Sequence, residues 1–148
     1  MSEVVEPCRD CKLWRTSQTS NGLYSCNKMT GTGNPQAEVM FVGDWPGDDE
    51  LKNRLPLSGL MGQLLKRAAT SVGISLDKCY LTYLCKCKPA FDSPPGRAEM
   101  TTCSKYLLEE IRTVRPRVVV ALGANVAAAF GIKGGTSVKF IVVVTLAV

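Results

Sequence analysis

Short apolar runs alternate with stretches of helical periodicity along this chain of 148 residues, and this alternation limits its fold more than any other feature. We expect strands at residues 38–42, 80–85, 117–122 and 139–145, with a helix in each interval between them. The strands are almost continuously apolar, as is typical of strands buried on both faces. The pattern predicts one domain over residues 1–148, an α/β fold built as a three-layer α/β/α sandwich around a central four-stranded parallel sheet.

The first helix is predicted from apolar residues at helical spacing, beginning after Ser58, a residue type that often caps helices. A second helix is expected to carry one apolar face made of Cys103, Leu107, Ile111 and Val114, and residues 124–130 are expected to form a third helix. Residues 1–36 lack such periodicity, so they are predicted to be an irregular segment that a bound metal orders. The residues that the first helix is predicted to turn towards the sheet are Leu60, Leu64, Leu65, Ala68 and Val72.

Composition narrows the kind of site. The chain has seven cysteines and 45% hydrophobic residues, so it needs no disulfide scaffold, and a thiol-based site in a reducing compartment is the better interpretation. Glu3 and Glu6 argue against a signal peptide, and the apolar run 138–148 is about half the roughly 20 residues of a membrane helix. A net charge of +5 favours encounter with polyanions such as nucleic acids. Because the chain has no histidine, its chemistry must use carboxylates, thiols or backbone groups.

Four cysteines form two pairs that can hold a metal. Cys8 and Cys11 have two residues between them, a spacing that lets both thiolates turn towards one metal. Cys87 and Cys103 have 15 residues between them, so a loop must bring them together. Spacing alone leaves zinc and an iron–sulfur cluster open, with zinc slightly ahead. The other cysteines are interpreted as core residues at strand positions, Cys79 and Cys85, or left unassigned, Cys26.

Several ordered segments of the chain resemble the family 4 uracil-DNA glycosylases, the iron–sulfur branch of that superfamily. Residues 39–47 read V-M-F-V-G-D-W-P-G, similar to the strand and G-E-x-P-G motif of the family. Residues 55–65 are similar to its P-F-V-G-x-x-G segment, and residues 80–89, Y-L-T-Y-L-C-K-C-K-P, to its Y-I-T-N-x-V-K-C-R-P segment. The resemblance implies a uracil-DNA glycosylase-like fold and a [4Fe–4S] cluster ligated by Cys8, Cys11, Cys87 and Cys103.

The resemblance also implies a pocket for a flipped-out base, and that pocket is altered here. Leu57 replaces the stacking Phe and offers no π face, and Tyr83 replaces an Asn whose amide can pair with uracil. The histidine of the family's last motif should follow residues 142–146, where the chain reads Ala-Val and ends. The substrate-pocket positions implied by the resemblance are Gly43, Asp44, Trp45, Pro46, Gly47, Leu57 and Tyr83.

Asp44 is the candidate catalytic residue, because it occupies the place of a family residue near the attacking water. A carboxylate there can orient water or stabilise a positively charged sugar. The alternative interpretation is that Asp44 bonds its own backbone in a Gly- and Pro-rich turn. DNA phosphates are expected to be contacted by Lys86, Lys88, Arg97 and Lys105, with Lys12 and Arg15 beside the first cysteine pair.

These features favour a [4Fe–4S] glycosylase-like DNA-binding protein whose base excision is lost or reduced. It would act as an accessory factor in DNA replication or repair, in the cytoplasm of a bacterial or phage-infected cell. It resembles the glycosylase-like modules of some viral DNA polymerases, which suggests a polymerase or other replication protein as partner. Two alternatives stay open: an active uracil-DNA glycosylase that hydrolyses the N-glycosidic bond of deoxyuridine, and a zinc-bound α/β interaction module.

Overall fold

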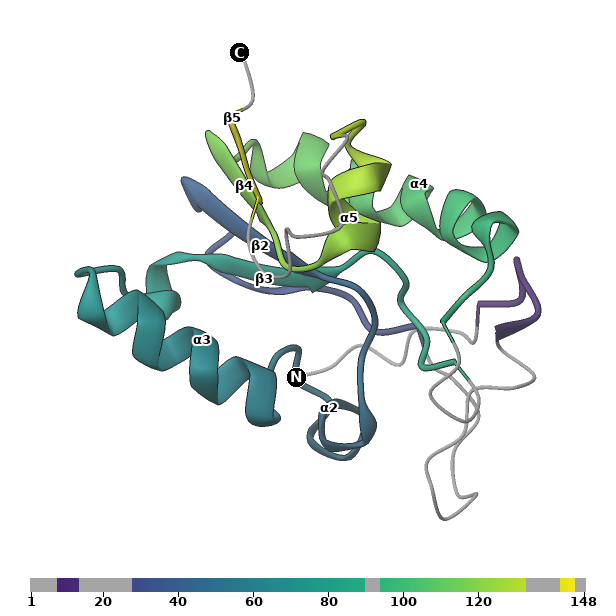
Figure 1. Cartoon of the computed structure of the whole chain (residues 1–148), viewed down its shortest axis with the longest axis horizontal. Coiled ribbons are helices and arrows are strands. Elements are labelled where there is room, and N and C mark those ends of the chain that lie inside the picture. The colour runs from purple at the N-terminus through teal and green to yellow at the C-terminus, as the bar shows by residue number, and fades with distance from the viewer. Residues whose placement is uncertain (1–7, 14–27, 90–93, 133–141, 146–148) are drawn as a thin grey trace.

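The computed structural model describes residues 8–13, 28–89, 94–132 and 142–145, and within them five strands form one mixed sheet (Figure 1). The order of the strands across the sheet is β1-β3-β2-β4-β5. Strands β3, β2 and β4 are parallel, whereas β1 is antiparallel to β3 and β5 is antiparallel to β4. The strands are β1 (Thr32–Gly33), β2 (Val39–Gly43), β3 (Tyr80–Tyr83), β4 (Val118–Ala121) and β5 (Val142–Thr145).

The four predicted strands are present, but the prediction of an all-parallel sheet is wrong. Its last strand, β5, runs antiparallel, and the short β1 adds an edge strand inside the segment expected to be irregular. An apolar run shows that a strand is buried but carries no information about its direction. Antiparallel edge strands on an otherwise parallel sheet are common. Residues 139–141 of the predicted last strand lie outside the described residues.

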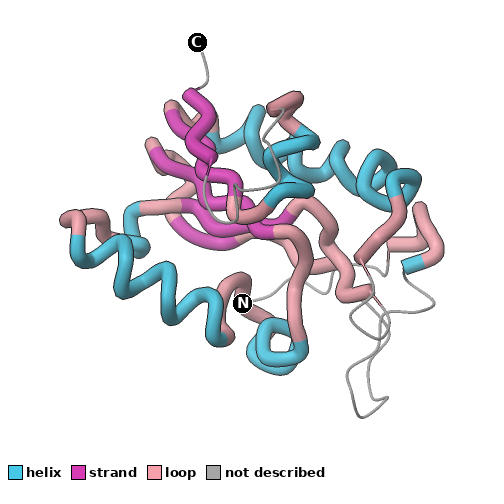
Figure 2. The backbone as a smooth tube through the Cα atoms, in the orientation of Figure 1, coloured by secondary structure: helices cyan, strands magenta, loops and turns pink. Residues whose placement is uncertain are grey.

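Helices lie on both sides of the sheet, α3 on one and α4 and α5 on the other (Figures 1 and 2). The central strand β2 shows why its sequence is apolar throughout. Phe41 packs with Leu65 on the α3 side, while Met40 and Val42 pack with Leu107 on the α4 side. The helices are α2 (Asp48–Asn53), α3 (Leu60–Ser71), the 3₁₀ turn η1 (Leu76–Lys78), α4 (Arg97–Val114) and α5 (Ala124–Ala129).

The predicted face of α3 is largely wrong. Leu65 and Ala69 are buried as the helix contacts the sheet, whereas Leu60 and Val72 are each 70% exposed. Gly62 decides the orientation, because a Cβ there would lie 1.5 Å from the carbonyl oxygen of Leu57. Only glycine permits this close approach, so the helix turns Gly62 inwards. Among the residues predicted to face the sheet, Leu60, Leu64, Ala68 and Val72 are exposed.

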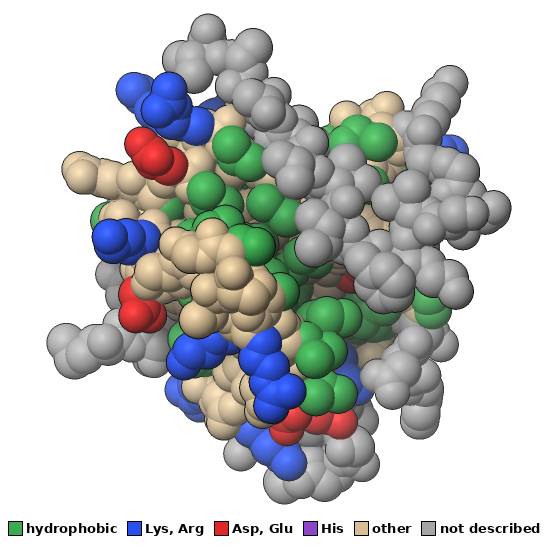
Figure 3. Space-filling view, turned by 60° about the vertical axis from the view of Figure 1, so that its left-hand side comes forward, with side chains coloured by type: hydrophobic (Ala, Val, Ile, Leu, Met, Phe, Trp, Pro, Cys, Tyr) green, Lys and Arg blue, Asp and Glu red, His purple; other side chains and the backbone are tan. Residues whose placement is uncertain are grey.

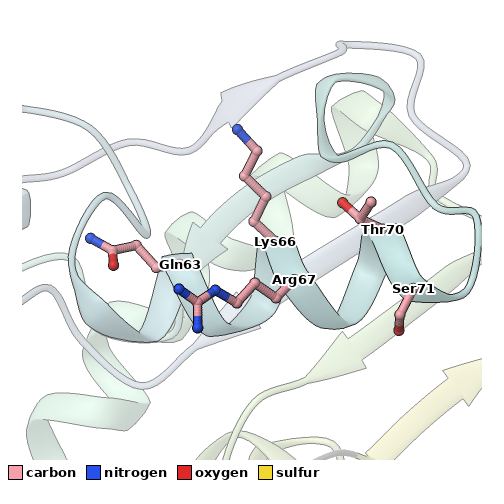
Figure 4. A pocket seen from close by; sticks show the side chains of 5 residues that line it. All are labelled: Gln63, Lys66, Arg67, Thr70 and Ser71. Carbon is pink, nitrogen blue, oxygen red and sulfur yellow. The ribbon is translucent and has the colours of Figure 1, made fainter.

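The outer side of α3 carries a shallow hollow lined by Gln63, Lys66, Arg67, Thr70 and Ser71 (Figure 4). Hydrophobic side chains reach the surface in Figure 3 beside Lys and Arg side chains. No thiol or carboxylate lines the hollow, so we do not assign it to the chemistry discussed below. Within the described part of the chain, no helix is long and apolar enough to cross a membrane.

Candidate functional site

The segment of residues 8–13 is fastened to the first half of α4, beside which it lies in Figure 1. Lys105 lies 2.6 Å from Asp10, and Lys12 lies 3.3 Å from Glu99. The Tyr106 hydroxyl also donates a hydrogen bond to Asp10. The hydrogen bond from Lys105 is the largest cause that lowers the pKa of Asp10 to about 2. These polar contacts fix the position of the N-terminal cysteines relative to α4.

Cysteines from three parts of the chain meet beside this contact. Cys85, Cys87 and Cys103 are buried around Leu13, and Cys11 packs against them at the surface. We call these four thiol residues and Leu13 the cysteine core. Cys8 lies just outside it, with its sulfur 3.2 Å from the hydroxyl of Tyr106. The structure therefore brings the predicted metal ligands into one region, with Cys85 as an additional thiol.

Cys103 is the most strongly engaged sulfur of the cysteine core. The backbone N–H of Lys86 donates to it at 3.2 Å, and the thiol of Cys85 forms a second hydrogen bond with it. The Cys85 bond is the largest cause of a lowered pKa at Cys103. Donors directed at a cysteine sulfur stabilise its thiolate, which is the form that binds metals.

Cys87 is disulfide-bonded, whereas the other five cysteines of the described residues, Cys8, Cys11, Cys79, Cys85 and Cys103, are free thiols. Within the described ranges, no three cysteines or carboxylates are grouped so that they could hold one metal ion. A zinc ion needs its sulfurs about 2.3 Å from a single point, whereas the irons of a cluster each take one cysteine at separate corners. Cys87 would have to be reduced to the thiol before it could bind any metal.

Three of the predicted base-pocket residues lie together, but a side chain already fills the space between them. Gly43 and Tyr83 are partners across β2 and β3, and a Cβ on Gly43 would lie 2.9 Å from two ring carbons of Tyr83. The Tyr83 hydroxyl accepts a 2.8 Å hydrogen bond from the backbone N–H of Leu57. Tyr83 is only 3% exposed and Leu57 is buried beside it. The phenol therefore occupies the volume over Gly43.

The remaining loop residues of the predicted pocket have structural contacts. Trp45 packs against the cysteine core, and Pro46 is buried. Gly47 donates its backbone N–H to the buried carboxylate of Glu50 at 3.0 Å, and Gly59 donates to the other oxygen of Glu50 at 3.0 Å. Glu50 thus ties the loop after β2 to the start of α3. Sequence reasoning did not single out this role, because only the fold brings Gly59 to Glu50.

Asp44 lies between the end of β2 and the start of α5. A Cβ on Gly123 would come within 2.9 Å of its Oδ2, and the backbone of Val126 forms a hydrogen bond with the carboxylate. Its Oδ1 is buried and has no hydrogen-bond donor among the described residues. Burial raises the pKa of Asp44, because the charged form is poorly solvated there. The free oxygen can accept a hydrogen bond from a water molecule.

Two of the predicted DNA-contacting lysines are buried, so those predictions need correction. The ammonium of Lys86 is 1% exposed and lies 2.6 Å from Glu110 Oε2 and 2.5 Å from Thr82 Oγ1. Lys88 is likewise buried, 3.5 Å from Asp48. The sequence could not show this, because Glu110 follows Lys86 only after 23 residues and meets it through the fold. The other two candidates, Arg97 and Lys105, are exposed on α4, and Arg15 lies outside the described residues.

Replacing Asp44 by Asn should stabilise the protein at neutral pH. The raised pKa means that ionised Asp44 costs stability, and this cost develops as pH rises from the unfolded value of about 4 through the folded pKa. Because Asp44 is partly exposed, we expect Asp44→Asn to gain about 0.5–1 kcal/mol in urea unfolding at pH 7, and nothing at pH 3.5.

Glu50→Gln is the matched control for that measurement. Both oxygens of Glu50 accept backbone N–H groups, so an amide NH₂ would face a donor, and a loss of about 1–2 kcal/mol is expected. An Asp44→Asn protein less stable than wild type at pH 7 would show that hydrogen bonds to the carboxylate outweigh the cost of its burial.

Comparisons with known proteins agree with this architecture. Residues 30–146 match the family model of the uracil DNA glycosylase superfamily. The chain is 34% identical over 126 residues to the type-4 uracil-DNA glycosylase of Saccharolobus solfataricus, covering 84% of this chain and 55% of that protein. It is also 34% identical over 125 residues to the type-4 uracil-DNA glycosylase of Thermotoga maritima, covering 84% of this chain and 61% of that protein. The chain thus spans little more than half the length of these relatives.

A third relative is of a different kind. The DNA polymerase of Bacillus phage SP01 is 28% identical over 101 residues, covering 68% of this chain and 11% of the polymerase. The family match spans most of the chain, and it includes Cys85, Cys87, Cys103 and the loop after β2. The chain therefore belongs to the uracil-DNA glycosylase superfamily, as a divergent chain of its family 4.

Proposed function

We propose that this chain is a DNA-binding, [4Fe–4S]-holding member of the superfamily whose base excision is lost or strongly reduced. The observation that carries the proposal is the side chain of Tyr83, which lies in the volume over Gly43 and bonds the backbone of Leu57. A pocket that its own protein fills has no room for an extruded base.

The chemistry of the filled pocket supports the same conclusion. A flipped uracil is held by stacking and by a donor and acceptor pair directed at its Watson–Crick edge. Leu57 has no aromatic face, and the hydroxyl of Tyr83 already accepts the N–H of Leu57. Rotating Tyr83 out would leave that buried N–H without an acceptor, which costs about 1–3 kcal/mol. The structure therefore favours the closed pocket.

The cluster has a structural role in this proposal. Cys8, Cys11, Cys87 and Cys103 would hold it, once Cys87 is reduced, and these residues come from the N-terminal segment, the loop after β3 and α4. When bound, the cluster supplies a covalent link between these three parts of the chain. The polar contacts of residues 8–13 with α4 would hold the ligands close together before the cluster binds.

DNA contact is assigned to the exposed cations around the same anchor. Arg97 lies in the first turn of α4, Lys105 follows two turns later, and Lys12 belongs to the docked segment. Phosphate contacts need positive charge at fixed positions and no base pocket, so they survive its loss. We infer an accessory role in DNA replication or repair. The similarity to part of a phage DNA polymerase supports a viral setting and a polymerase partner.

An active glycosylase is the second candidate, and one observation favours it. Oδ1 of Asp44 is buried without a donor among the described residues, as a group that orients a water molecule would be. That candidate also requires Tyr83 to leave the base pocket and to give up its hydrogen bond with the backbone N–H of Leu57. The following experiment separates the two.

Wild-type protein is expected to release no uracil in single-turnover assays with stoichiometric protein, on either single- or double-stranded DNA, because the base pocket is closed. It should also bind deoxyuridine-containing and thymidine-containing DNA equally. Leu57→Phe combined with Tyr83→Asn should open the pocket and favour deoxyuridine-containing DNA by about tenfold, the value of one good recognition pair. Excision by the wild type that disappears in Asp44→Asn would instead establish the active glycosylase.

Removing one phosphate-contacting cation should change the salt dependence of DNA binding. We expect Arg97→Gln to reduce the slope of log Kobs against log salt by about 0.7–0.9, since one fewer counterion is released. Lys66→Gln is the control, because Lys66 is also exposed but lies on α3, across the sheet. Equal slope changes in both variants would show that no defined DNA-binding face exists around the cysteines.

A further inference from the structure

The outward side of α3 is apolar along one edge, although this edge faces solvent. Leu60 and Val72 are each 70% exposed, and Met61 is 58% exposed. Leu64, which lies between them, is 51% exposed. Residues four apart are neighbours on a helix surface, so these side chains form one strip, which is of the kind that marks an interaction surface. We call this strip the apolar flank of α3; it consists of Leu60, Met61, Leu64, Ala68 and the C-cap Val72.

A basic flank runs beside the apolar flank. It carries the shallow hollow of α3, from which the side chains of Lys66 and Arg67 extend (Figure 4). Neither cation forms an ion pair with another residue that the structure describes. The sequence of α3 itself contains no carboxylate. The charge of this flank is therefore uncompensated within the described part of the chain, and it complements acidic groups.

We propose that α3 is a docking surface for an amphipathic helix of another protein. The apolar face of that helix covers Leu60 and Leu64, and its acidic residues pair with Lys66 and Arg67. The apolar flank is about 18 Å long at 1.5 Å per residue, which matches about three turns of a partner helix. Burial of the flank supplies affinity, and the charge pairs select an acidic partner and its orientation.

This surface is separate from the proposed DNA-binding face. α3 covers one side of the sheet, whereas α4, which carries Arg97 and Lys105, covers the other (Figure 1). The inference therefore goes beyond the proposed function and does not depend on the cluster or on the base pocket. A protein that binds DNA through α4 keeps α3 available for its partner.

The composition of α3 favours a protein helix over two other occupants. A second copy of this chain in a two-fold contact would present the same α3, which has cations and no carboxylate to pair with them. Nucleic acid takes positive charge at its phosphates and aromatic rings at unpaired bases. α3 has no aromatic residue, and its most exposed side chains are aliphatic. An acidic amphipathic helix matches both flanks at once.

The test uses two synthetic helical peptides of about four turns, each with leucine at every third or fourth position. One carries glutamate on the flanking positions and its twin carries lysine there. Fluorescence anisotropy with the full-length chain should show that the glutamate peptide binds about tenfold more tightly at low salt, with a preference that decreases as salt rises. The double variant Lys66→Gln, Arg67→Gln should remove this preference.

Two leucine variants test the apolar flank. Leu64→Ser should weaken binding of the glutamate peptide about tenfold, because less apolar surface is buried in the complex. Leu108→Ser is the matched control, since Leu108 is 47% exposed but lies on α4, and it should bind the peptide as wild type does. Leu64→Ser should also retain the DNA affinity of wild type, so that failure of the docking surface is distinguished from failure of DNA binding.

Four outcomes overturn the inference. The first two are that wild type binds neither peptide, or binds both equally at low salt. The third is a wild-type dimer in sedimentation velocity that Leu64→Ser dissociates, which would assign the flank to a second copy of this chain. The fourth is binding to phosphatidylserine–phosphatidylcholine vesicles that Leu64→Ser abolishes, which would assign it to a membrane surface.

Discussion

The docking of residues 8–13 on α4 is the contact on which the rest of the site depends. It brings Cys8 and Cys11, from the start of the chain, to the region of two later cysteines. Of these, Cys87 follows β3 and Cys103 lies in α4. Exposed ion pairs such as Asp10–Lys105 contribute little stability on their own. Thiolate bonds to a metal are far stronger, so the polar contacts align the segment and a bound cluster would hold it.

The base pocket shows how a fold can be kept while its chemistry changes. Gly43 and Tyr83 face each other because β2 and β3 pair in register, and this backbone arrangement belongs to the sheet. The side chain at one position then decides between an open and a filled pocket. Tyr83 fills it and also satisfies the backbone of Leu57, which adopts a left-handed conformation with φ of 53°. Such a residue costs about 1–3 kcal/mol when unsupported, and the hydrogen bond helps to hold it.

The sequence predicted the elements better than their arrangement. Apolar runs marked the main strands, but strand direction and the inward face of α3 depend on contacts between distant segments. Gly62 lies on the inward face of α3 because the backbone of Leu57 comes too close to it for any side chain. The spacing of apolar residues does not show this contact. The burial of Lys86 required Glu110, a residue on another element. Cysteine spacing and family resemblance singled out thiols of which Cys11, Cys87 and Cys103 lie together in the structure, whereas the packing of Cys85 among them depends on the fold.

Metal and sulfide analysis after anaerobic reconstitution of the fully reduced protein tests the central claim most directly. The account predicts four iron and four acid-labile sulfide per chain, with a broad visible absorbance band, and loss of both in Cys103→Ser. Stoichiometric zinc without sulfide would contradict it and establish the zinc-bound module. Protein that takes up neither metal while Cys87 is a free thiol would show that the cysteine core is only a packed cluster of thiols.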